Sequence, residues 1–553
     1  MPIEGFTPFP QDKARLYREK GYWQDLTLGD ILDRSAYIVP DKEAVWDQRV
    51  RVTYSGLKTY ADRLALGLLE MGIGKDDRIV VQVPNCAEFL YLYFAMAKIG
   101  AIGVMALPAH RAREIEHLCK LTDAVALAIP DRIRDFSFTD MAQELKPKVP
   151  SLKHVLVVGE SVPLGMVAMK DLLERPREME FPPDHLSRFR PHPDDVATIL
   201  TTGGTTAMPK GVPRTHNDYI ANSIRSGRRV SRNADTPILI CTPIGHNAAL
   251  MLSVGAAVVN GARMVIIPRH DPDQVCRVIQ EEKVATTILM PTQAIDVLGF
   301  PGLNKYDLSS LRDFICGGSH VPPELVRESR EKLGCYVHNM FGMAEGPVST
   351  VTLEDPFDVM CETVGLPCCP DDEMKIVDDN GREVAQGEVG ELLFRGPHTF
   401  YGYYKAPAVN QEAFDPDGFH HTGDYARIDH RARLQIVGRK KDIIIRGGEN
   451  ISSFEVEELL MEHPKVENVA VIGMPDKRLG ERVCAFIKAS PGETITFQEV
   501  VDFLMSKQIA KFKLPERLEL VDEFPLSTVG KILKRDLVDD ITRRLKDEEK
   551  LER

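Results

Sequence analysis

Short β-branched runs alternate with longer apolar or amphipathic stretches through the first three-quarters of the chain. The run "DRIVVQVPN" (77–85) predicts a strand, and "CAEFLYLYFAMAKIG" (86–100) predicts the helix that follows it and ends at Gly100. Further strands are expected at 154–160, 197–204, 262–268, 284–291 and 311–318. Alternation of this kind predicts a largely parallel, buried sheet, whose ligand sites lie beyond the carboxyl ends of the strands.

The pattern changes after about Gly365. Residues 372–396 and 424–452 alternate polar and apolar positions between turns, which predicts a small antiparallel β unit. From about Lys441 a compact α+β pattern follows, with helices at 452–464 and 496–507, strands at 466–475 and 481–489, and a final segment at 517–525. The expected fold is therefore α/β: a large N-terminal domain (1–440) of parallel-sheet layers with a small β unit, and a small, mobile α+β C-terminal domain (441–553).

Composition limits the function classes. A chain of 553 residues with 43% hydrophobic and 27% charged residues is globular and too long for one core. Its net charge of −13 argues against a nucleic-acid partner, although a local basic cluster would still admit an anionic substrate. The N-terminal stretch has no signal-peptide pattern, and no run of eighteen apolar residues predicts a membrane span.

Cysteine usage indicates a reducing compartment. The ten cysteines contain no C-x-x-C pair, and the adjacent Cys368 and Cys369 suit neither a disulfide framework nor a zinc site. We therefore expect a soluble, cytoplasmic protein, and the sequence leaves open whether it forms a homodimer.

The stretch "TTGGTTAMPKG" (201–211) follows one of the predicted strands. It is not a Walker A loop, because the glycine spacing differs and neither Ser nor Thr follows Lys210. Glycine N–H groups, threonine hydroxyls and one lysine are nevertheless suited to phosphate; they belong to Thr201, Thr202, Gly203, Gly204, Thr205, Thr206 and Lys210. A solvated turn between two strands explains the stretch equally well when it is taken alone.

Six further motifs follow in order: "GHN" (245–247), "GGSH" (317–320), "FGMAEG" (341–346), "HTGD" (421–424), "GRKKDIIIRGGENI" (438–451) and "PLSTVGK" (525–531). Together with the first stretch, this series resembles the adenylate-forming superfamily of acyl-CoA synthetases, aryl acid ligases and peptide-synthetase adenylation domains. The resemblance covers essentially the whole chain. It implies that residues 201–211 wrap the phosphates of ATP, although the family usually has Gly at Ala207 and Ser at Gly203.

The resemblance also assigns roles to the later motifs. It implies that Glu345 binds Mg²⁺, since a hard cation prefers a carboxylate and offsets phosphate charge. Asp424 matches the carboxylate that accepts the ribose hydroxyls, and Arg439 matches a second nucleotide contact. The adenine is expected to stack on Phe341 and to meet the backbone of "GGSH" and "FGMAEG", at Gly317, Gly318, Ser319, Gly342, Met343 and Ala344.

The C-terminal motifs imply two domain orientations. Lys531 matches the lysine that reaches the acyl carboxylate and the α-phosphate, where the approach of two anions requires positive charge. Lys441 matches the hinge about which the small domain swings. In the second orientation Gly447 and Gly448 are expected to line a tunnel for the thiol arm of coenzyme A.

Within the superfamily, "FGMAEG", "PRTHNDY" and "GHN" resemble the branch that activates aryl or alicyclic acids. The resemblance implies an acid pocket at His246, Asn247, Leu252, Gly317, Gly318, Met343 and Val348, with His246 also counted as catalytic. Hydroxybenzoate enzymes carry Ser where this chain has Leu252, and an unpaired buried hydroxyl costs about 1–3 kcal/mol. The sequence therefore favours a bare ring, benzoate-like or alicyclic.

The acceptor is less sharply defined. Coenzyme A is expected, because the chain carries no appended carrier module, and the alternative is an aryl acid–AMP ligase of the 2,3-dihydroxybenzoate type that loads a separate carrier protein. Two other classes of protein are disfavoured by the motifs. A nucleotide-binding regulator without catalysis is disfavoured by the intact Lys531, Glu345 and Asp424, and a Walker-type ATPase is disfavoured by the missing G-K-[ST] loop.

Overall fold

The computed structural model describes residues 2–202, 208–446, 449–476, 478–507, 509–527 and 530–551. Of the predicted site residues, Gly203, Gly204, Thr205, Thr206, Gly447 and Gly448 lie outside these ranges. Lys441 is described only by its backbone, which lies in a 3₁₀ turn, Lys440–Asp442, between the last two sheets of the chain.

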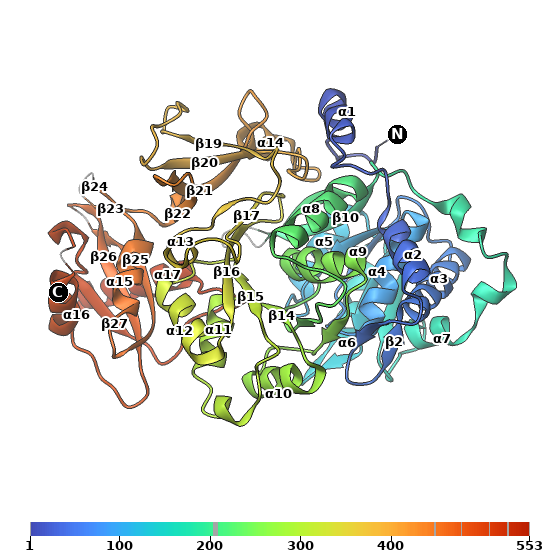
Figure 1. Cartoon of the computed structure of the whole chain (residues 1–553), viewed down its shortest axis with the longest axis horizontal. Coiled ribbons are helices and arrows are strands. Elements are labelled where there is room, and N and C mark those ends of the chain that lie inside the picture. Colours follow the sequence, from blue (N-terminus) through green and yellow to red (C-terminus); the bar gives the residue numbers. More distant parts are fainter. Residues whose placement is uncertain are drawn as a thin grey trace.

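Two large, mainly parallel sheets form the bulk of the described chain (Figure 1). The first has the strand order β11-β10-β4-β3-β5-β8-β9, and only its β10–β11 pair is antiparallel. Its strands are β3 (Arg78–Val81), β4 (Ile102–Met105), β5 (Ala126–Pro130), β8 (His154–Val158), β9 (Val167–Ala168), β10 (Val196–Thr202) and β11 (Lys210–Thr215).

The second sheet has the order β18-β17-β16-β15-β14-β12-β13-β1-β2 and is parallel from β16 to β1. Its strands are β1 (Glu43–Trp46), β2 (Arg51–Thr53), β12 (Ile238–Ile240), β13 (Met264–Ile266), β14 (Thr286–Leu289), β15 (Asp313–Gly317), β16 (Tyr336–Gly342), β17 (Val348–Thr350) and β18 (Leu366–Pro367). The strand and helix predictions from periodicity are confirmed in both sheets.

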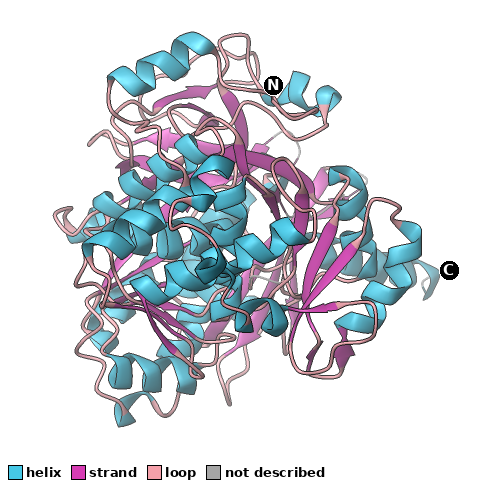
Figure 2. Cartoon of the chain, turned by 90° about the vertical axis from the view of Figure 1, so that its right-hand side faces the viewer, coloured by secondary structure: helices cyan, strands magenta, loops and turns pink. Residues whose placement is uncertain are grey.

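Helices cover these sheets (Figure 2). They also supply the largest hydrophobic core. That core contains α2 (Leu28–Ile38), α3 (Tyr54–Glu70), α4 (Ala87–Ile99), α8 (His216–Arg229), a π-helical segment η4 (Ala249–Gly255) and α9 (Ala256–Asn260). The helix α4 is buried on nearly every side, and its end is at Gly100, which adopts the left-handed conformation with φ 72°. The remaining helices of this part are α1 (Gln11–Glu19), α5 (Ala112–Thr122), α6 (Phe138–Leu145), α7 (Met169–Glu174), α10 (Pro272–Glu282), α11 (Pro291–Leu298), α12 (Pro323–Leu333), α13 (Phe357–Glu362) and α14 (Pro407–Ala413).

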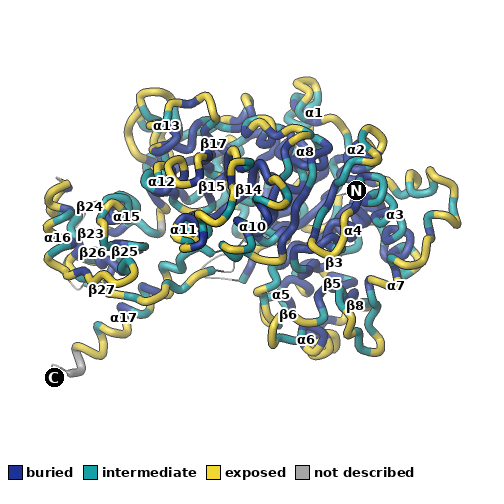
Figure 3. Tube along the Cα trace, turned by 60° about the horizontal axis from the view of Figure 1, so that its bottom comes forward, coloured by how far each residue is buried: buried dark blue, intermediate teal, exposed yellow. Residues whose placement is uncertain are grey.

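The expected small β unit is an antiparallel sheet of β19 (Glu373–Val377), β20 (Gly390–Arg395), β21 (His420–Ile428) and β22 (Leu434–Arg439). The C-terminal part has its own sheet, with β23 (Ile444–Arg446), β24 (Glu449–Ile451), β25 (Val466–Asp476), β26 (Gly480–Ala489) and β27 (Arg517–Leu520). It also has its own hydrophobic clusters, to which α15 (Ser453–Met461), α16 (Phe497–Ser506) and α17 (Lys534–Leu551) contribute. Figure 3 shows α17 extending away from the body, with much of its surface exposed.

Two broader properties follow from this packing. All ten cysteines are buried and unpaired, as expected for a chain without a disulfide framework. Within the described ranges, none of the helices has both the length and the apolar character that crossing a membrane requires.

Candidate active site

The site lies where β15 and β16 end at the same edge of the second sheet. At Gly317 a Cβ atom would lie 2.2 Å from the carbonyl oxygen of Met340, so only glycine allows these strands to approach so closely. The next residue, Gly318, has φ 83°, and a Cβ there would lie 3.3 Å from Cε of Lys531. Gly317 and Gly318 therefore present only backbone at this turn, and the side chain of Lys531 lies next to Gly318.

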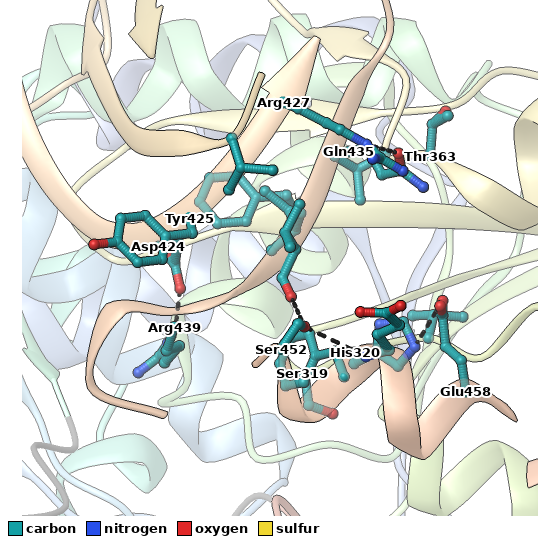
Figure 4. Close-up of a pocket in the computed structure, with 18 of the residues that line it drawn as sticks. Ser319, His320, Thr363, Asp424, Tyr425, Arg427, Gln435, Arg439, Ser452 and Glu458 are labelled. Carbon is teal, nitrogen blue, oxygen red and sulfur yellow. Dashed lines mark hydrogen bonds and ion pairs between the residues drawn. The ribbon is translucent and has the colours of Figure 1, made fainter. Parts of the chain in front are cut away.

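Two cavities meet at this turn. The first, of about 660 Å³, lies between the strand ends, the small β sheet and α15, and is shown in Figure 4. Of the predicted residues it is lined by Gly318, Ser319, Phe341, Gly342, Met343, Asp424, Arg439 and Lys531. The second, of about 610 Å³, is lined by Thr201, Thr202, His246, Gly318, Ser319, Arg439 and Lys531. Lys531 lies on the wall of both.

Asp424, which is buried, and Arg439, which is exposed, form an ion pair on neighbouring strands. They are register partners in β21 and β22, and Nε of Arg439 lies 3.2 Å from Oδ1 of Asp424 (Figure 4). Burial raises the pKa of Asp424, while the charges of Arg439 and Lys531 act in the opposite direction. The pair presents one buried carboxylate to the first cavity, a suitable acceptor for sugar hydroxyls.

Glu345 is 4% exposed and is oriented by Tyr403, whose hydroxyl donates to Oε1 at 2.7 Å. Burial raises the pKa of Glu345, and the hydrogen bond from Tyr403 opposes that rise. A bound cation would favour the ionised carboxylate, so the residue fits a divalent metal ion. Lys210 lies 4.7 Å from the Tyr403 ring centre, which brings the end of the predicted phosphate stretch near this carboxylate.

Lys531 is held near the site by contacts across the predicted domain boundary. The Thr292 hydroxyl, at the start of α11, donates to the carbonyl of Gly530 at 2.8 Å. His320 Nε2 lies 3.1 Å from Oε1 of Glu458, and its ring packs on Phe454 of α15 (Figure 4). The structure thus has the arrangement in which the C-terminal lysine reaches the strand-end turn.

His246 lies at the wall of the second cavity as a neutral imidazole. Burial and the nearby charge of Lys531 lower its pKa to about 4, and the backbone N–H of Ala248 approaches Nδ1 at 3.4 Å. Asn247 links two neighbouring segments by hydrogen bonds. Its Oδ1 accepts from the Tyr219 hydroxyl at 3.0 Å, and its Nδ2 donates to the Met343 carbonyl at 3.2 Å.

Other predicted residues lie behind the cavity walls. Leu252 is 3% exposed in η4 and Val348 is 1% exposed at the start of β17, both within the large core. Neither of them is among the residues that line the two cavities in the described chain. Their contact with an acid therefore stays a prediction.

The sequence reasoning missed two residues that support the site, Tyr403 and Arg214. Arg214, at 0% exposed, donates to the carbonyls of Ala344 and His398 at 2.8 and 2.9 Å and pairs with Asp218 at 3.0 Å. It thereby fixes the loop that carries Glu345. The sequence predicted no strand at 210–215, so nothing indicated that Arg214 would be buried and that its charge would need a partner.

The fold and this site define an adenylate-forming enzyme: two parallel-sheet layers, a small β unit and an α+β C-terminal part surround one nucleotide-sized space. The chain belongs to the AMP-binding enzyme family, whose model matches residues 32–404, and the C-terminal domain of AMP-binding enzymes matches residues 455–531.

Similar proteins cover the chain end to end. A 2,3-dihydroxybenzoate-AMP ligase of Bacillus subtilis (strain 168) is 38% identical over 544 residues, covering 98% of this chain and 99% of the relative. A salicylyl-CoA synthase / salicylate adenylyltransferase of a Streptomyces species is 38% identical over 541 residues, covering 98% of each chain. The apo structure of Mycobacterium smegmatis MbtA superposes with a TM-score of 0.74 at 36% identity, over 97% of this chain and 98% of that one. These relatives agree with the aryl-acid branch expected from the motifs.

Proposed function

We propose that this protein is an aryl acid–AMP ligase that activates an aromatic carboxylic acid with ATP and passes the acyl group to a carrier-protein thiol. The main support is the end-to-end similarity to ligases named for 2,3-dihydroxybenzoate and salicylate, including a salicyl-AMP ligase / salicyl-S-ArCP synthetase of Mycobacterium tuberculosis at 37% identity. The sequence offered this activity as the alternative to a CoA ligase for a bare ring. The relatives support the aryl acid–AMP ligase better than the CoA ligase.

In the first half-reaction a carboxylate oxygen of the acid attacks the α-phosphorus of ATP, and the bond to pyrophosphate breaks with its electron pair leaving on pyrophosphate. Lys531 supplies positive charge where the two anions meet, and Asp424 accepts the ribose hydroxyls. Mg²⁺, held by Glu345, would offset the phosphate charge. His246 lines the second cavity as a neutral side chain, so an aromatic acid bound there would meet the positive charge of Lys531 and no second one from the imidazole.

In the second half-reaction the thiol sulfur attacks the acyl carbon, the thiol proton is lost to solvent, and AMP leaves with the electrons of the broken bond. The relatives point to two thiols. A carrier protein is favoured here, and coenzyme A is the second candidate because the Streptomyces relative is named a salicylyl-CoA synthase.

Pyrophosphate exchange into ATP tests the acid. The full-length protein is assayed with salicylate, 2,3-dihydroxybenzoate, benzoate, cyclohexanecarboxylate and a straight-chain fatty acid. Hydroxybenzoates are expected to give the highest kcat/KM; a preference for cyclohexanecarboxylate or the fatty acid would overturn the aryl assignment. The preferred acid is then offered with free CoA or a phosphopantetheinylated aryl carrier domain, and thioester formed only on CoA would overturn the choice of acceptor.

A further inference from the structure

Three side chains outside the two cavities bring potential metal ligands to one buried point. The Sγ atom of Cys369, a carboxylate oxygen of Asp372 and a ring nitrogen of His398 all lie within 4.8 Å of one another. Cys369 and Asp372 belong to the connection between β18 and β19, and His398 follows β20. Cys369 is 1% exposed, and the side chains of Asp372 and His398 are fully buried.

The hydrogen bonds of His398 leave one ring nitrogen directed at this cluster. Its Nδ1 lies 3.1 Å from the carbonyl oxygen of Gly346, so Nδ1–H is the donor and Nε2 carries the lone pair in the neutral ring. Nε2 faces the carboxylate of Asp372. Burial lowers the pKa of His398, but the nearby Asp372 and Cys369 outweigh that effect and raise it to about 10, so without an ion this nitrogen holds a proton against the carboxylate. Metal-binding histidines commonly show this arrangement, with one nitrogen on the ion and the other N–H on a backbone carbonyl.

Asp372 and Cys369 complete the arrangement. Oδ2 of Asp372 accepts the backbone N–H of Cys369 at 3.2 Å, while Oδ1 has no hydrogen-bond partner in the described part of the chain. His398 Nε2 and Asp372 Oδ2 are 3.3 Å apart. That separation is close to the edge of a tetrahedron with arms of about 2.0–2.2 Å, the usual zinc–nitrogen and zinc–oxygen lengths.

We propose that Cys369, Asp372 and His398 bind a divalent transition-metal ion of the zinc type. One thiolate, one imidazole and one carboxylate form a borderline-soft ligand set that suits Zn²⁺ better than Mg²⁺ or Ca²⁺. Binding displaces the thiol proton of Cys369 and the Nε2 proton of His398, and both protons leave to solvent; a water molecule completes four-coordination. The ion is additional to the Mg²⁺ expected at Glu345.

Such an ion would act as a structural cross-link near the nucleotide site. It would join the β18–β19 connection to the segment after β20, and through His398 Nδ1 to the carbonyl of Gly346, the residue after Glu345. Cys369 and Asp372 are three residues apart and His398 follows 26 residues later, so the spacing of cysteines alone does not indicate this site. The proposal replaces the expectation that Cys369 suits no zinc site.

Metal analysis of the full-length, untagged protein tests the proposal. Protein produced with added zinc is dialysed against a weak chelator, and its zinc content is measured by mass spectrometry. The variants are Cys369→Ser and His398→Gln. Cys368→Ser is the matched control, because Cys368 is the neighbouring buried thiol and is not one of the three clustered ligands. Wild type and Cys368→Ser are expected to retain about one zinc per chain, and the two ligand variants to lose it.

Cobalt substitution of the wild type gives a second readout that needs no variant to fold. Co²⁺-loaded wild type is expected to show a thiolate-to-cobalt charge-transfer band in the near ultraviolet, and Tm should rise with either ion. Wild type that retains no zinc, lacks the cobalt band and has the same Tm with and without metal would overturn the proposal and leave a metal-free imidazole–carboxylate pair. Equal zinc in wild type and Cys369→Ser would overturn it as well.

Discussion

Lys531 is the residue whose position depends on both parts of the chain, since its side chain lies over Gly318. Changing Lys531→Ala is expected to slow pyrophosphate exchange by about a hundred- to a thousandfold, because a preorganised charge of this kind contributes about 3–4 kcal/mol. Thioester formation from supplied acyl-adenylate should stay near the wild-type rate. Lys546→Ala, on the exposed surface of α17, is the control. Equal damage to both half-reactions would contradict a role confined to adenylation.

His246 predicts a pH dependence of stability. Its pKa in the folded state is lowered to about 4, against about 6.5 in the unfolded chain. Below pH 6.5 the imidazole therefore becomes protonated in the unfolded chain and stays neutral in the folded protein. The folded state loses stability as the pH falls from about 6.5 to 4. Between pH 7 and 5 the free energy of unfolding should fall by about 1–2 kcal/mol more in wild type than in His246→Gln. Urea titrations at both pH values measure this, and identical losses would contradict the neutral state of the folded imidazole.

Leu252 remains the predicted determinant of ring preference. If it contacts the ring, Leu252→Ser should raise the ratio of kcat/KM for salicylate over benzoate by about ten- to a hundredfold, since a partner for the hydroxyl and the lost apolar contact each contribute about 1–2 kcal/mol. Leu252→Ala removes the same bulk without adding a hydroxyl and serves as the control. An unchanged ratio in Leu252→Ser would mean that the side chain faces the core alone.

At the scale of elements, β11 and α8 support the loop that follows β16. Arg214→Met would leave Asp218 buried and unpaired, which is expected to cost about 3–5 kcal/mol of stability. Adding Asp218→Asn should recover part of that loss, as urea unfolding will measure. Pyrophosphate exchange should stay low in the double variant, because the carbonyls of Ala344 and His398 still lack their donor. Full recovery of exchange would show that Arg214 contributes stability only.

The sequence predicted those elements whose hydrophobic pattern is local. The run at 77–100 became β3 and α4 because its strand and helix are buried along their whole length and end in strong breakers. Arg214 was missed because its partners, Asp218 apart, come from distant loops that periodicity does not place. The motifs indicated which residues form the site, but the position of Leu252 depends on a π-helical turn, which changes the direction of side chains relative to an ordinary helix.

At the scale of the whole molecule, contacts such as Thr292 with Gly530 and His320 with Glu458 hold the C-terminal part in this arrangement. Thr292→Val removes the hydrogen bond to Gly530, worth about 1 kcal/mol, and should lower pyrophosphate exchange about fivefold by shifting the population away from the orientation with Lys531 in the site. Thioester formation from supplied acyl-adenylate should be unchanged or faster. Glu458→Gln, which weakens the contact with His320, should act in the same direction. Slower rates in both half-reactions would contradict the shift.

The ten buried thiols allow local and global unfolding to be measured by cysteine labelling. A small alkylating reagent can reach these sulfurs only when the surrounding structure opens, so the labelling rate measures the free energy of that opening. Nine of the cysteines precede residue 441, and Cys484 alone lies in the C-terminal sheet. If the C-terminal part unfolds by itself, intact-mass spectra will show a singly labelled species first. If the chain opens as one unit, molecules will pass directly from unlabelled to fully labelled.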